Sequence, residues 1–447
     1  MTPESSSVES SRSSVSTKIF LIVAIFSLPI GVLAYLLAAN YTPQIASAQL
    51  EISGNSLQKP LMRVLYGLAS SKNTLQGCET AACSSSLASP TALVSASLDA
   101  AAAVNTQVAA DLNTNADGLA KKNHKDLALE NLQSQWKLLA AASGKVSTPE
   151  ERAELVSGYD HLFAQVKQLV SYAGDTSSLI LDPDLDSYYL VDVTLLAMPE
   201  TVSHIANTAT IGNRLLAGTT ANAAVDQAAL ANESVLLEES INRIAASNST
   251  TFDADAANHG VSPTLQPKLS AALQAYKGAA ASYATTLKAI LANPAQTTPA
   301  ALATQAAALQ KASLDYWETS AAELDGLLNL RIADFESSRI QALGFSALAV
   351  VLATIIAFII GRSITKPLQE LVRNLAPGAT LLGVSVERIA EASQSQTPSA
   401  EESAIICEEL NAHADNMRKA VLELARHVEG SAAASRLVSE DAGQTRS

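Results

Sequence analysis

The sequence predicts an all-α protein that two apolar helices anchor in a membrane. Of its 447 residues, 48% are hydrophobic but only 4% are aromatic. This composition favours long packed helices over sheets, which are richer in β-branched and aromatic residues. Two charge-free apolar stretches are long enough to cross a bilayer. The segments between them carry apolar residues at helical spacing.

The charge and the cysteines exclude several classes of partner. The net charge is −14, and no basic cluster could neutralise a phosphate backbone, so we expect no nucleic acid. Cys78 and Cys83 lie close together, and an oxidising compartment would allow a disulfide between them. No histidine accompanies them, so we expect no metal, and we expect no cofactor. Cys407 is interpreted as a small apolar packing residue.

The first span is predicted at residues 19–39, after an N-terminal tail of residues 1–18. Pro29 can kink this helix, which membrane helices tolerate. The alternative is a cleaved signal peptide, since residues 46–48 (Ala-Ser-Ala) resemble a cleavage site. The apolar stretch is longer than a signal core, which favours an uncleaved span.

The second span is predicted at residues 340–361, between Arg339 and Arg362. More basic residues follow this span than follow the first, so the positive-inside rule places both termini in the cytoplasm. Residues 40–339 then lie outside the membrane. Arg331 weakens this asymmetry slightly.

We expect about six helices in residues 40–339, with a break in the last near residues 293–294. Their ranges are 41–76, 90–143, 149–180, 184–218, 222–250 and 263–340. Thr148, Pro149 and Glu151 form a capping box that marks one start. Ser-Pro or Thr-Pro pairs at 89–90, 262–263 and 298–299 mark others. Helices this long suggest a bundle standing on the membrane, either one bundle or two stacked bundles.

One segment, LILDPDLDSYYLVD at residues 179–192, stands out. Asp182, Asp184 and Asp186 imitate a calcium loop, but Ser187 replaces its glycine and Val193 its glutamate. One interpretation is a helix break at Pro183 with an aspartate cap. The other is that Tyr188, Tyr189 and the helix start face a ligand cavity, where a helix N-terminus would favour an anion.

This segment resembles the extracytoplasmic helical domains of bacterial methyl-accepting chemotaxis proteins and some sensor histidine kinases. Glu51, Gly54 and Pro60 in the first helix match acidic, glycine and proline positions of those domains. The resemblance implies a receptor and does not name its ligand. Candidate ligand-binding residues are Arg63, Tyr66, Tyr188 and Tyr189, with Lys59 beside Arg63; an arginine can hold a carboxylate with two bonds.

The region after the second span begins like a HAMP linker at residues 362–380. Pro367 opens the first helix of such a linker, but residues 376–378 (Ala-Pro-Gly) are expected to interrupt it. Residues 381–438 then follow a heptad pattern, with Leu382 and Ile389 on one seam, which predicts a coiled coil. Residues 439–447 are expected to be disordered.

Pairs of acidic or amide residues recur at heptad spacing in this tail and resemble the methylation helix of chemotaxis receptors. The candidate methylation sites are Gln394, Glu401, Glu402, Glu408 and Glu409. Such pairs are also ordinary on an exposed coiled-coil face. No hairpin tip that would engage a kinase follows, so the chain resembles a chemoreceptor truncated before that tip.

These observations lead to one main functional hypothesis and two alternatives. The main hypothesis is a homodimeric chemoreceptor-like transducer in the inner membrane of a bacterium. It would bind a small molecule outside, pass a conformational change to the cytoplasmic coiled coil, and join other chemoreceptors. The alternatives are a non-signalling receptor remnant or membrane scaffold, and the input half of a sensor histidine kinase. No catalytic motif supports an enzyme.

Overall fold

A computed structural model describes residues 15–77, 83–146, 148–394 and 406–423. The described residues are helical or in turns and contain no strand, which confirms the all-α prediction. The chain divides into two units. The larger unit is Val23–Thr354, and the smaller one is formed by Met1–Ile22 and Ile355–Ser447.

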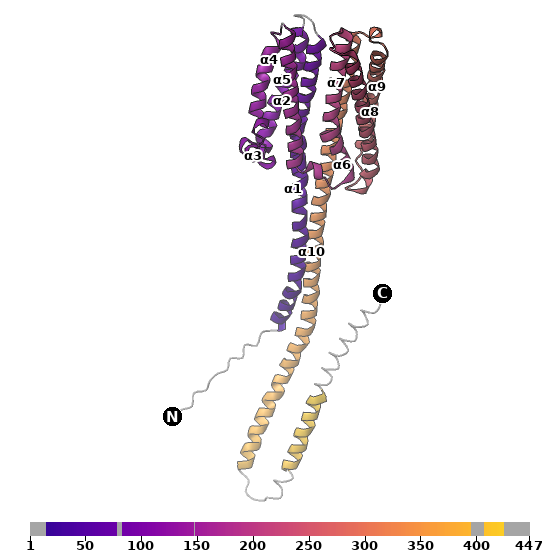
Figure 1. The fold of residues 1–447 in the computed structure, drawn as a ribbon. Coiled ribbons are helices and arrows are strands. Elements are labelled where there is room, and N and C mark those ends of the chain that lie inside the picture. Colours follow the sequence, from indigo (N-terminus) through magenta and orange to yellow (C-terminus); the bar gives the residue numbers. More distant parts are fainter. Residues whose placement is uncertain (1–14, 78–82, 147, 395–405, 424–447) are drawn as a thin grey trace. The chain divides into compact units, whose positions relative to one another are not determined.

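Figure 1 labels the helices α1 to α10 of the described residues. They are α1 (Val15–Gly77), α2 (Cys83–Leu112), α3 (Ala116–Lys121), α4 (Leu129–Ser143), α5 (Pro149–Thr176), α6 (Leu185–Val191), α7 (Met198–Ala217), α8 (Ala223–Ala254), α9 (Leu265–Ala292) and α10 (Pro299–Gln394). A π-helical turn, Asp192–Ala197, joins α6 to α7. Short 3₁₀ turns occur at Lys125–Leu127, Leu179–Leu181, Asp255–Ala257 and Pro294–Gln296.

Several predicted helix ends are confirmed. Helix α5 begins at Pro149, and its Thr148 hydroxyl and Glu151 carboxylate form the expected capping box. The break near residue 293 separates α9 from α10, and α10 begins at Pro299 as the Thr-Pro pair predicted. Helix α9 begins at Leu265, slightly later than expected.

The single helix predicted at residues 90–143 is wrong, because this stretch forms α2, α3 and α4. Asn113 (φ 52°) and Asn123 (φ 60°) adopt left-handed backbone conformations, which asparagine tolerates better than most residues. These two residues end α2 and separate α3 from the next turn. The start predicted at Pro90 is also wrong, since α2 begins at Cys83 and contains Pro90.

Two groups of helices lie side by side in the larger unit and share one apolar core (Figure 1). In the first group, α2, α4 and α5 lie beside α1: Lys72 Nζ of α1 donates to Oδ1 of Asp160 in α5 at 2.6 Å, and the Trp136 indole of α4 donates to Ser95 Oγ of α2 at 2.9 Å. In the second, α7, α8 and α9 pack on α10. Helices α1 and α10 run antiparallel through the unit, and Asn55 Nδ2 donates to the carbonyl oxygen of Ala321 at 2.8 Å.

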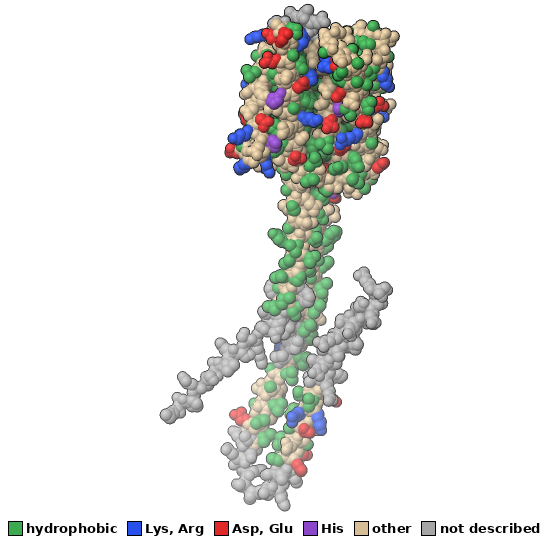
Figure 2. Space-filling view, viewed as in Figure 1, with side chains coloured by type: hydrophobic (Ala, Val, Ile, Leu, Met, Phe, Trp, Pro, Cys, Tyr) green, Lys and Arg blue, Asp and Glu red, His purple; other side chains and the backbone are tan. Residues whose placement is uncertain are grey.

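Three of the described helices contain segments that are long and apolar enough to cross a membrane, judged by length and composition. They are Leu21–Gly77 of α1, Ser85–Leu112 of α2 and Pro299–Ile364 of α10. In Figure 2, the neighbouring stretches of α1 and α10 beyond the helical groups carry hydrophobic side chains and almost no charge. Leu36 is 59% exposed there, and Phe345 is 69% exposed. In α2, by contrast, Leu87, Val94 and Leu98 are buried in the core.

In the smaller unit, α10 continues to Gln394, and residues 406–423 form a further helix. The interruption expected at residues 376–378 is wrong, because α10 runs through both Pro367 and Pro377. The described side chains of this unit are almost all exposed. Residues 395–405 and 424–447 lie outside the described residues, and so does the tail predicted to be disordered.

Candidate functional site: a buried charge network

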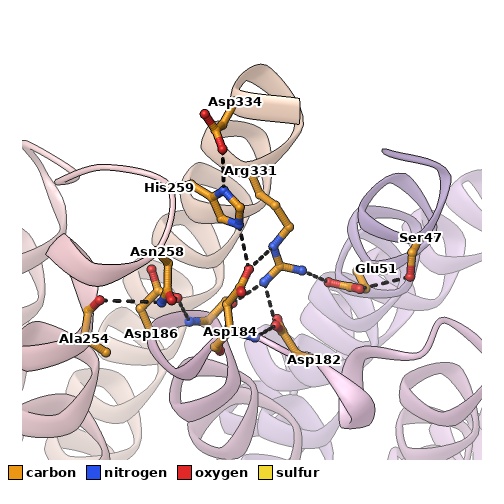
Figure 3. A network of polar contacts seen from close by, with 11 residues as sticks. Ser47, Glu51, Asp182, Asp184, Asp186, Ala254, Asn258, His259, Arg331 and Asp334 are labelled. Carbon is orange, nitrogen blue, oxygen red and sulfur yellow. Dashed lines mark hydrogen bonds and ion pairs between the residues drawn. The ribbon is translucent and has the colours of Figure 1, made fainter. Parts of the chain in front are cut away.

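A network of charged side chains joins α1, α10, the start of α6 and the turn after α8 (Figure 3). Its centre is Arg331 of α10, which is only 3% exposed. Glu51 of α1 is 2% exposed and Asp182 is 6% exposed. Charged residues are seldom buried unless they are paired, so this cluster differs from the solvated charges on the helix surfaces.

The Arg331 guanidinium contacts three carboxylates from two elements. Nη1 donates to Oε2 of Glu51 at 2.9 Å, and Nη2 donates to Oδ1 of Asp182 at 2.5 Å. Nη2 also donates to Oγ of Ser187 at 2.5 Å, and Nε lies 2.5 Å from Oδ2 of Asp184. The planar fork of donors lets one arginine hold α10 to α1 and to the start of α6 together.

The sequence around Pro183 brings these aspartates to the arginine. Helix α6 begins after Pro183, and Asp184 stands at its N-cap position without making a side-chain cap bond. Instead, Oδ1 of Asp182 accepts the backbone N–H of Asp184 at 2.9 Å, which shapes the turn. Oδ1 of Asp186 accepts the N–H of Ser187 at 2.8 Å. The expected break is confirmed, while the Asp184 carboxylate is turned toward Arg331.

His259 extends the network from Asp184 to Asp334. Nε2 of His259 lies 3.0 Å from Oδ2 of Asp184, and Nδ1 lies 2.9 Å from Oδ2 of Asp334. A carboxylate only accepts, so both bonds form together when the ring carries both protons. The His259 ring packs edge-on against Phe335, with the ring centroids 4.9 Å apart, and Phe335 lies against Tyr41 of α1.

Asn258, beside this histidine, connects the turn after α8 to α6. Its Nδ2 donates to Oδ1 of Asp186 at 2.7 Å. Thr251 of α8 also donates to the backbone oxygen of Asp186 at 3.2 Å. The network therefore connects the second helical group to the start of α6 by hydrogen bonds from uncharged donors as well as by ion pairs.

The negative charge of the network exceeds its positive charge. The pKa of Glu51 is raised to about 7, chiefly by burial and also by the nearby Asp182, and Arg331 offsets only part of the effect. Burial also raises the pKa of Asp182, whose Oδ2 is buried without a hydrogen-bond partner. Burial acts to lower the pKa of Arg331, but attraction from Asp182 and Glu51 outweighs it, so the pKa rises. Glu51 is thus placed to exchange a proton near neutral pH.

The residues predicted to bind a ligand come from two elements: Arg63 and Tyr66 lie on α1, and Tyr188 and Tyr189 follow the network residue Ser187 in α6. Arg63 is half exposed, and its Nε donates to Oε1 of Glu318 at 2.7 Å. Lys59 pairs with Asp325 of α10. Tyr66 is 3% exposed, and burial raises the pKa of its hydroxyl.

Tyr188 and Tyr189 contact each other edge to face, with the ring centroids 5.4 Å apart. Tyr188 is 41% exposed. The structure describes no hydrogen bond or ion pair between either of these tyrosines and Arg63. Their role in ligand binding stays a prediction, as does that of Tyr66.

The tail and cysteine predictions fall largely on residues that are not described. Glu401, Glu402 and Cys78 lie outside the described residues, so their methylation and the Cys78–Cys83 disulfide stay predictions. Gln394 is the last residue of α10. Glu408 and Glu409 are exposed on the helix of residues 406–423, and Cys407 beside them is exposed rather than packed.

Sequence reasoning noticed the aspartates of the network but missed Arg331 and His259 as their partners. From the sequence alone, Arg331 is only a charge near the second apolar stretch. In the described residues, no group of histidine, cysteine and acidic side chains is arranged to hold a metal ion. Compared with known proteins, the chain matches no family model, no curated protein and no solved structure.

Proposed function

We propose that the protein is a two-pass membrane signal transducer of the chemoreceptor type. Residues 40–339 form its sensor domain outside the membrane, and α10 carries the signal inward. The observation that supports this proposal is the position of Arg331. On the helix that continues into the second apolar stretch, it joins Glu51 of α1 to Asp182 and Asp184.

The two spans are the apolar stretches of α1 and α10. Their large side chains, such as Leu36 and Phe345, are exposed, as lipid-facing residues would be. The apolar residues of α2 instead pack in the core, so α2 belongs to the sensor domain. Lipid is therefore one partner of this protein.

Helix continuity gives the signal a route. Helix α1 is unbroken from the first span to Gly77, and α10 is unbroken from Pro299 to Gln394. A small shift or rotation of α10 against α1 would pass through the membrane without a hinge to absorb it. The Arg331 network lies where such a shift would change ion-pair partners.

The cytoplasmic helix needs a partner, which we propose is a second copy of the chain. Leu382 is 53% exposed and Ile389 is 51% exposed, although both lie on the predicted apolar seam. Pairing of two such seams in a parallel coiled coil would bury them. Glu408 and Glu409, exposed on the later helix, are available for methylation in this arrangement.

Cysteine labelling in intact cells tests the topology. In a background with Cys78→Ser and Cys83→Ser, native Cys407 reports one side and Ala228→Cys, on an exposed face of α8, reports the other. A membrane-impermeant maleimide should label Ala228→Cys at once and Cys407 only after the cells are permeabilised. Equal labelling of both positions before permeabilisation would overturn the two-pass topology.

Crosslinking tests signal transfer. In Cys407→Ser protein in membranes, Ile389→Cys should form disulfide-linked dimers faster than Ser385→Cys, which lies off the seam. Glu51→Gln should change the crosslinking rate at Ile389→Cys, whereas Glu154→Gln, an exposed change on α5, should not. If Glu51→Gln leaves the crosslinking rate at residue 389 unchanged, the result would argue for a membrane scaffold. If no crosslink forms at residue 389, the dimer would be excluded.

A further inference from the structure

The larger unit carries exposed apolar side chains at one end, on two neighbouring turns. The α6 turn, residues 178–185, leads from α5 into α6, and the α9 turn, residues 255–264, leads from α8 into α9. Leu181 is 75% exposed, Leu185 is 56% exposed and Val261 is 67% exposed. Single exposed apolar residues are ordinary on a protein surface, but turns are usually rich in polar residues, and here three large apolar side chains share adjoining turns.

The charged side chains of the two turns are held inside the protein. Asp182 and Asp255 are buried, and both carboxylate oxygens of Asp255 accept the backbone N–H of Ser262 at 3.1 Å. His259 joins the α9 turn to the α6 turn, with Nε2 3.0 Å from Oδ2 of Asp184 (Figure 3). Both turns are described throughout, and the positions that they leave exposed are leucine, valine, alanine, glycine, proline and threonine. The two turns therefore present an apolar surface.

The turns at the opposite end of the unit have the usual polar composition. They expose Lys145 between α4 and α5, Thr219 and Asn222 between α7 and α8, and Asn293 and Gln296 between α9 and α10. Contact with water accounts for the composition of that end, whereas the α6 and α9 turns fit a less polar environment.

The α6 and α9 turns lie at the end of the helical groups from which the apolar stretches of α1 and α10 extend (Figure 1). His259 of the α9 turn bonds to Asp334 and packs against Phe335 of α10. Asp334 precedes Ile340, where the second predicted span begins, by six residues, which is about 9 Å of helix. Phe335 also contacts Tyr41, two residues beyond the first predicted span. The headgroup layer of a bilayer is about 5–7 Å thick on each side, so the α9 turn lies next to it.

We propose that the α6 and α9 turns dock on the bilayer surface, where Leu181, Leu185 and Val261 insert among the lipid headgroups and the upper acyl chains. Insertion removes their apolar surface from water, as it does for other proteins that bind at the membrane interface. This inference rests on the proposed function, because both spans must lie in the membrane to bring the turns to its surface. It adds a lipid contact made by the sensor domain itself.

Lipid contact and the charge network act on the same turn. Leu181 and Leu185 flank Asp182 and Asp184, whose carboxylates contact Arg331 of α10. The bilayer surface therefore helps to position these aspartates against α10. A shift of α10 through the membrane in turn changes how the α6 turn meets the lipid.

Spin labels test the docking surface. Cys78, Cys83 and Cys407 are replaced by serine, and a nitroxide is attached to Leu181→Cys or to Val261→Cys. The full chain is placed in nanodiscs of phosphatidylethanolamine and phosphatidylglycerol. Oxygen concentrates in lipid and a nickel chelate stays in water, so collisions of the label with each reagent separate lipid, water and protein surroundings.

Leu138→Cys and Val225→Cys are the matched controls. Leu138 on α4 is 75% exposed, as Leu181 is, and Val225 is 60% exposed in the first turn of α8, at the opposite end of the unit from Val261. Labels at residues 181 and 261 should collide more with oxygen than with the nickel chelate, and labels at residues 138 and 225 should show the reverse. Leu36→Cys, in the apolar stretch of α1, is the reference for a lipid-facing position.

Two results would overturn the proposal. Labels at residues 181 and 261 that collide with the nickel chelate as readily as the controls do would place both turns in water. Labels protected from both reagents would show a protein contact, such as a second copy of the chain, in place of lipid. In either case a lipid-exposed label at Leu36→Cys would leave the two-pass topology standing, whereas a water-exposed label there would contradict the spans themselves.

Discussion

Arg331 and Glu51 stand 280 residues apart in the sequence, and their side chains are joined by a hydrogen bond of 2.9 Å. The bond connects α10 to α1 beside the apolar stretches of both helices. Because both partners are buried, solvent does not screen their interaction as it screens a surface pair. A change of charge on either residue should therefore affect stability strongly, which leads to the first two predictions.

Stability should depend on pH through Glu51. Its pKa is about 7 in the folded chain and near 4.5 without burial, so the folded state binds the proton more tightly. The stabilising contribution is full below pH 4.5 and is lost as the pH rises toward and through 7. Melting temperatures of the full chain in nanodiscs should therefore fall between pH 5 and pH 8.

Glu51→Gln keeps the size of the side chain and stays neutral, so it should flatten this pH dependence. The raised pKa values of Asp182 and Asp186 act in the same direction, so some slope should remain. Glu154→Gln on the exposed face of α5 serves as the control and should leave the slope unchanged. An identical slope in wild type and Glu51→Gln would refute the assignment to Glu51.

Removing Arg331 should lower the free energy of unfolding much more than removing an arginine on the surface. Arg331→Met leaves Glu51 and Asp182 buried without their cation, which typically costs about 3–5 kcal/mol. Arg63→Met breaks the half-exposed pair with Glu318 and should cost about 0–1 kcal/mol. Denaturant titrations of the two variants in detergent provide the comparison.

The loss of stability caused by Arg331→Met should also depend on the charge of the carboxylates that Arg331 contacts. At pH 5 more of the carboxylates are protonated, so the loss should be smaller than at pH 8. Adding Glu51→Gln to Arg331→Met should recover part of the stability, since the two residues are in contact. Additive effects of the two changes would contradict a direct interaction.

The sequence predicts those parts of the fold whose signal lies within a few neighbouring residues. The start of α5 was predicted because Thr148 and Glu151 form a capping box within one turn of sequence. The breaks around α3 were missed because alanine-rich flanks favour a continuous helix on propensity alone. Asn113 and Asn123 were the available signals, since asparagine is common in left-handed turns.

The charge network could be predicted only in part for the same reason. The aspartates around Pro183 form a dense local pattern and were recognised as unusual. Arg331 comes from another helix, and nothing in its local sequence distinguishes it from an ordinary charge flanking a membrane span. Only packing of α1 against α10 brings it to Glu51, and periodicity does not specify which helices pack together.

Gly54 should be intolerant of any side chain. It lies where α1 meets the end of α5, and a Cβ at this position would overlap Oγ and Cβ of Ser177. Gly54→Ala should therefore destabilise the chain by about 1–3 kcal/mol, the usual cost of overpacking. Gly278→Ala, in α9 with open space around it, should instead stabilise by up to about 1 kcal/mol because alanine favours helix.

A compensating change distinguishes this clash from a general loss of helix packing. Ser177→Gly removes both overlapping atoms, so the double variant Gly54→Ala with Ser177→Gly should be more stable than the sum of the single effects predicts. Thermal melts of the four proteins complete the cycle. Simple additivity would show that the close approach of α1 and α5 is not the cause.

The π-helical turn between α6 and α7 should depend on Trp317 of α10. In a regular helix the carbonyl of Thr194 would accept the N–H of Met198, but here that N–H bonds to Val193, five residues back. The freed Thr194 oxygen accepts the Trp317 indole N–H at 2.9 Å, and both residues are almost fully buried. Trp317→Phe removes this donor and leaves a buried carbonyl unpaired, at a cost of about 1–3 kcal/mol beyond the lost packing.

Trp136→Phe is the matched control. Trp136 is similarly buried, at 3% exposure, but its indole donates to the hydroxyl of Ser95, which can turn toward water when the indole is lost. Both changes remove the same atoms, so the difference between their unfolding free energies isolates the bond to the π-helical turn. Trp317→Phe should also speed hydrogen exchange at the amides of residues 192–198, because the turn would be free to return to regular helix. Unchanged exchange there, with equal costs for the two tryptophans, would show that the turn is held by its own sequence.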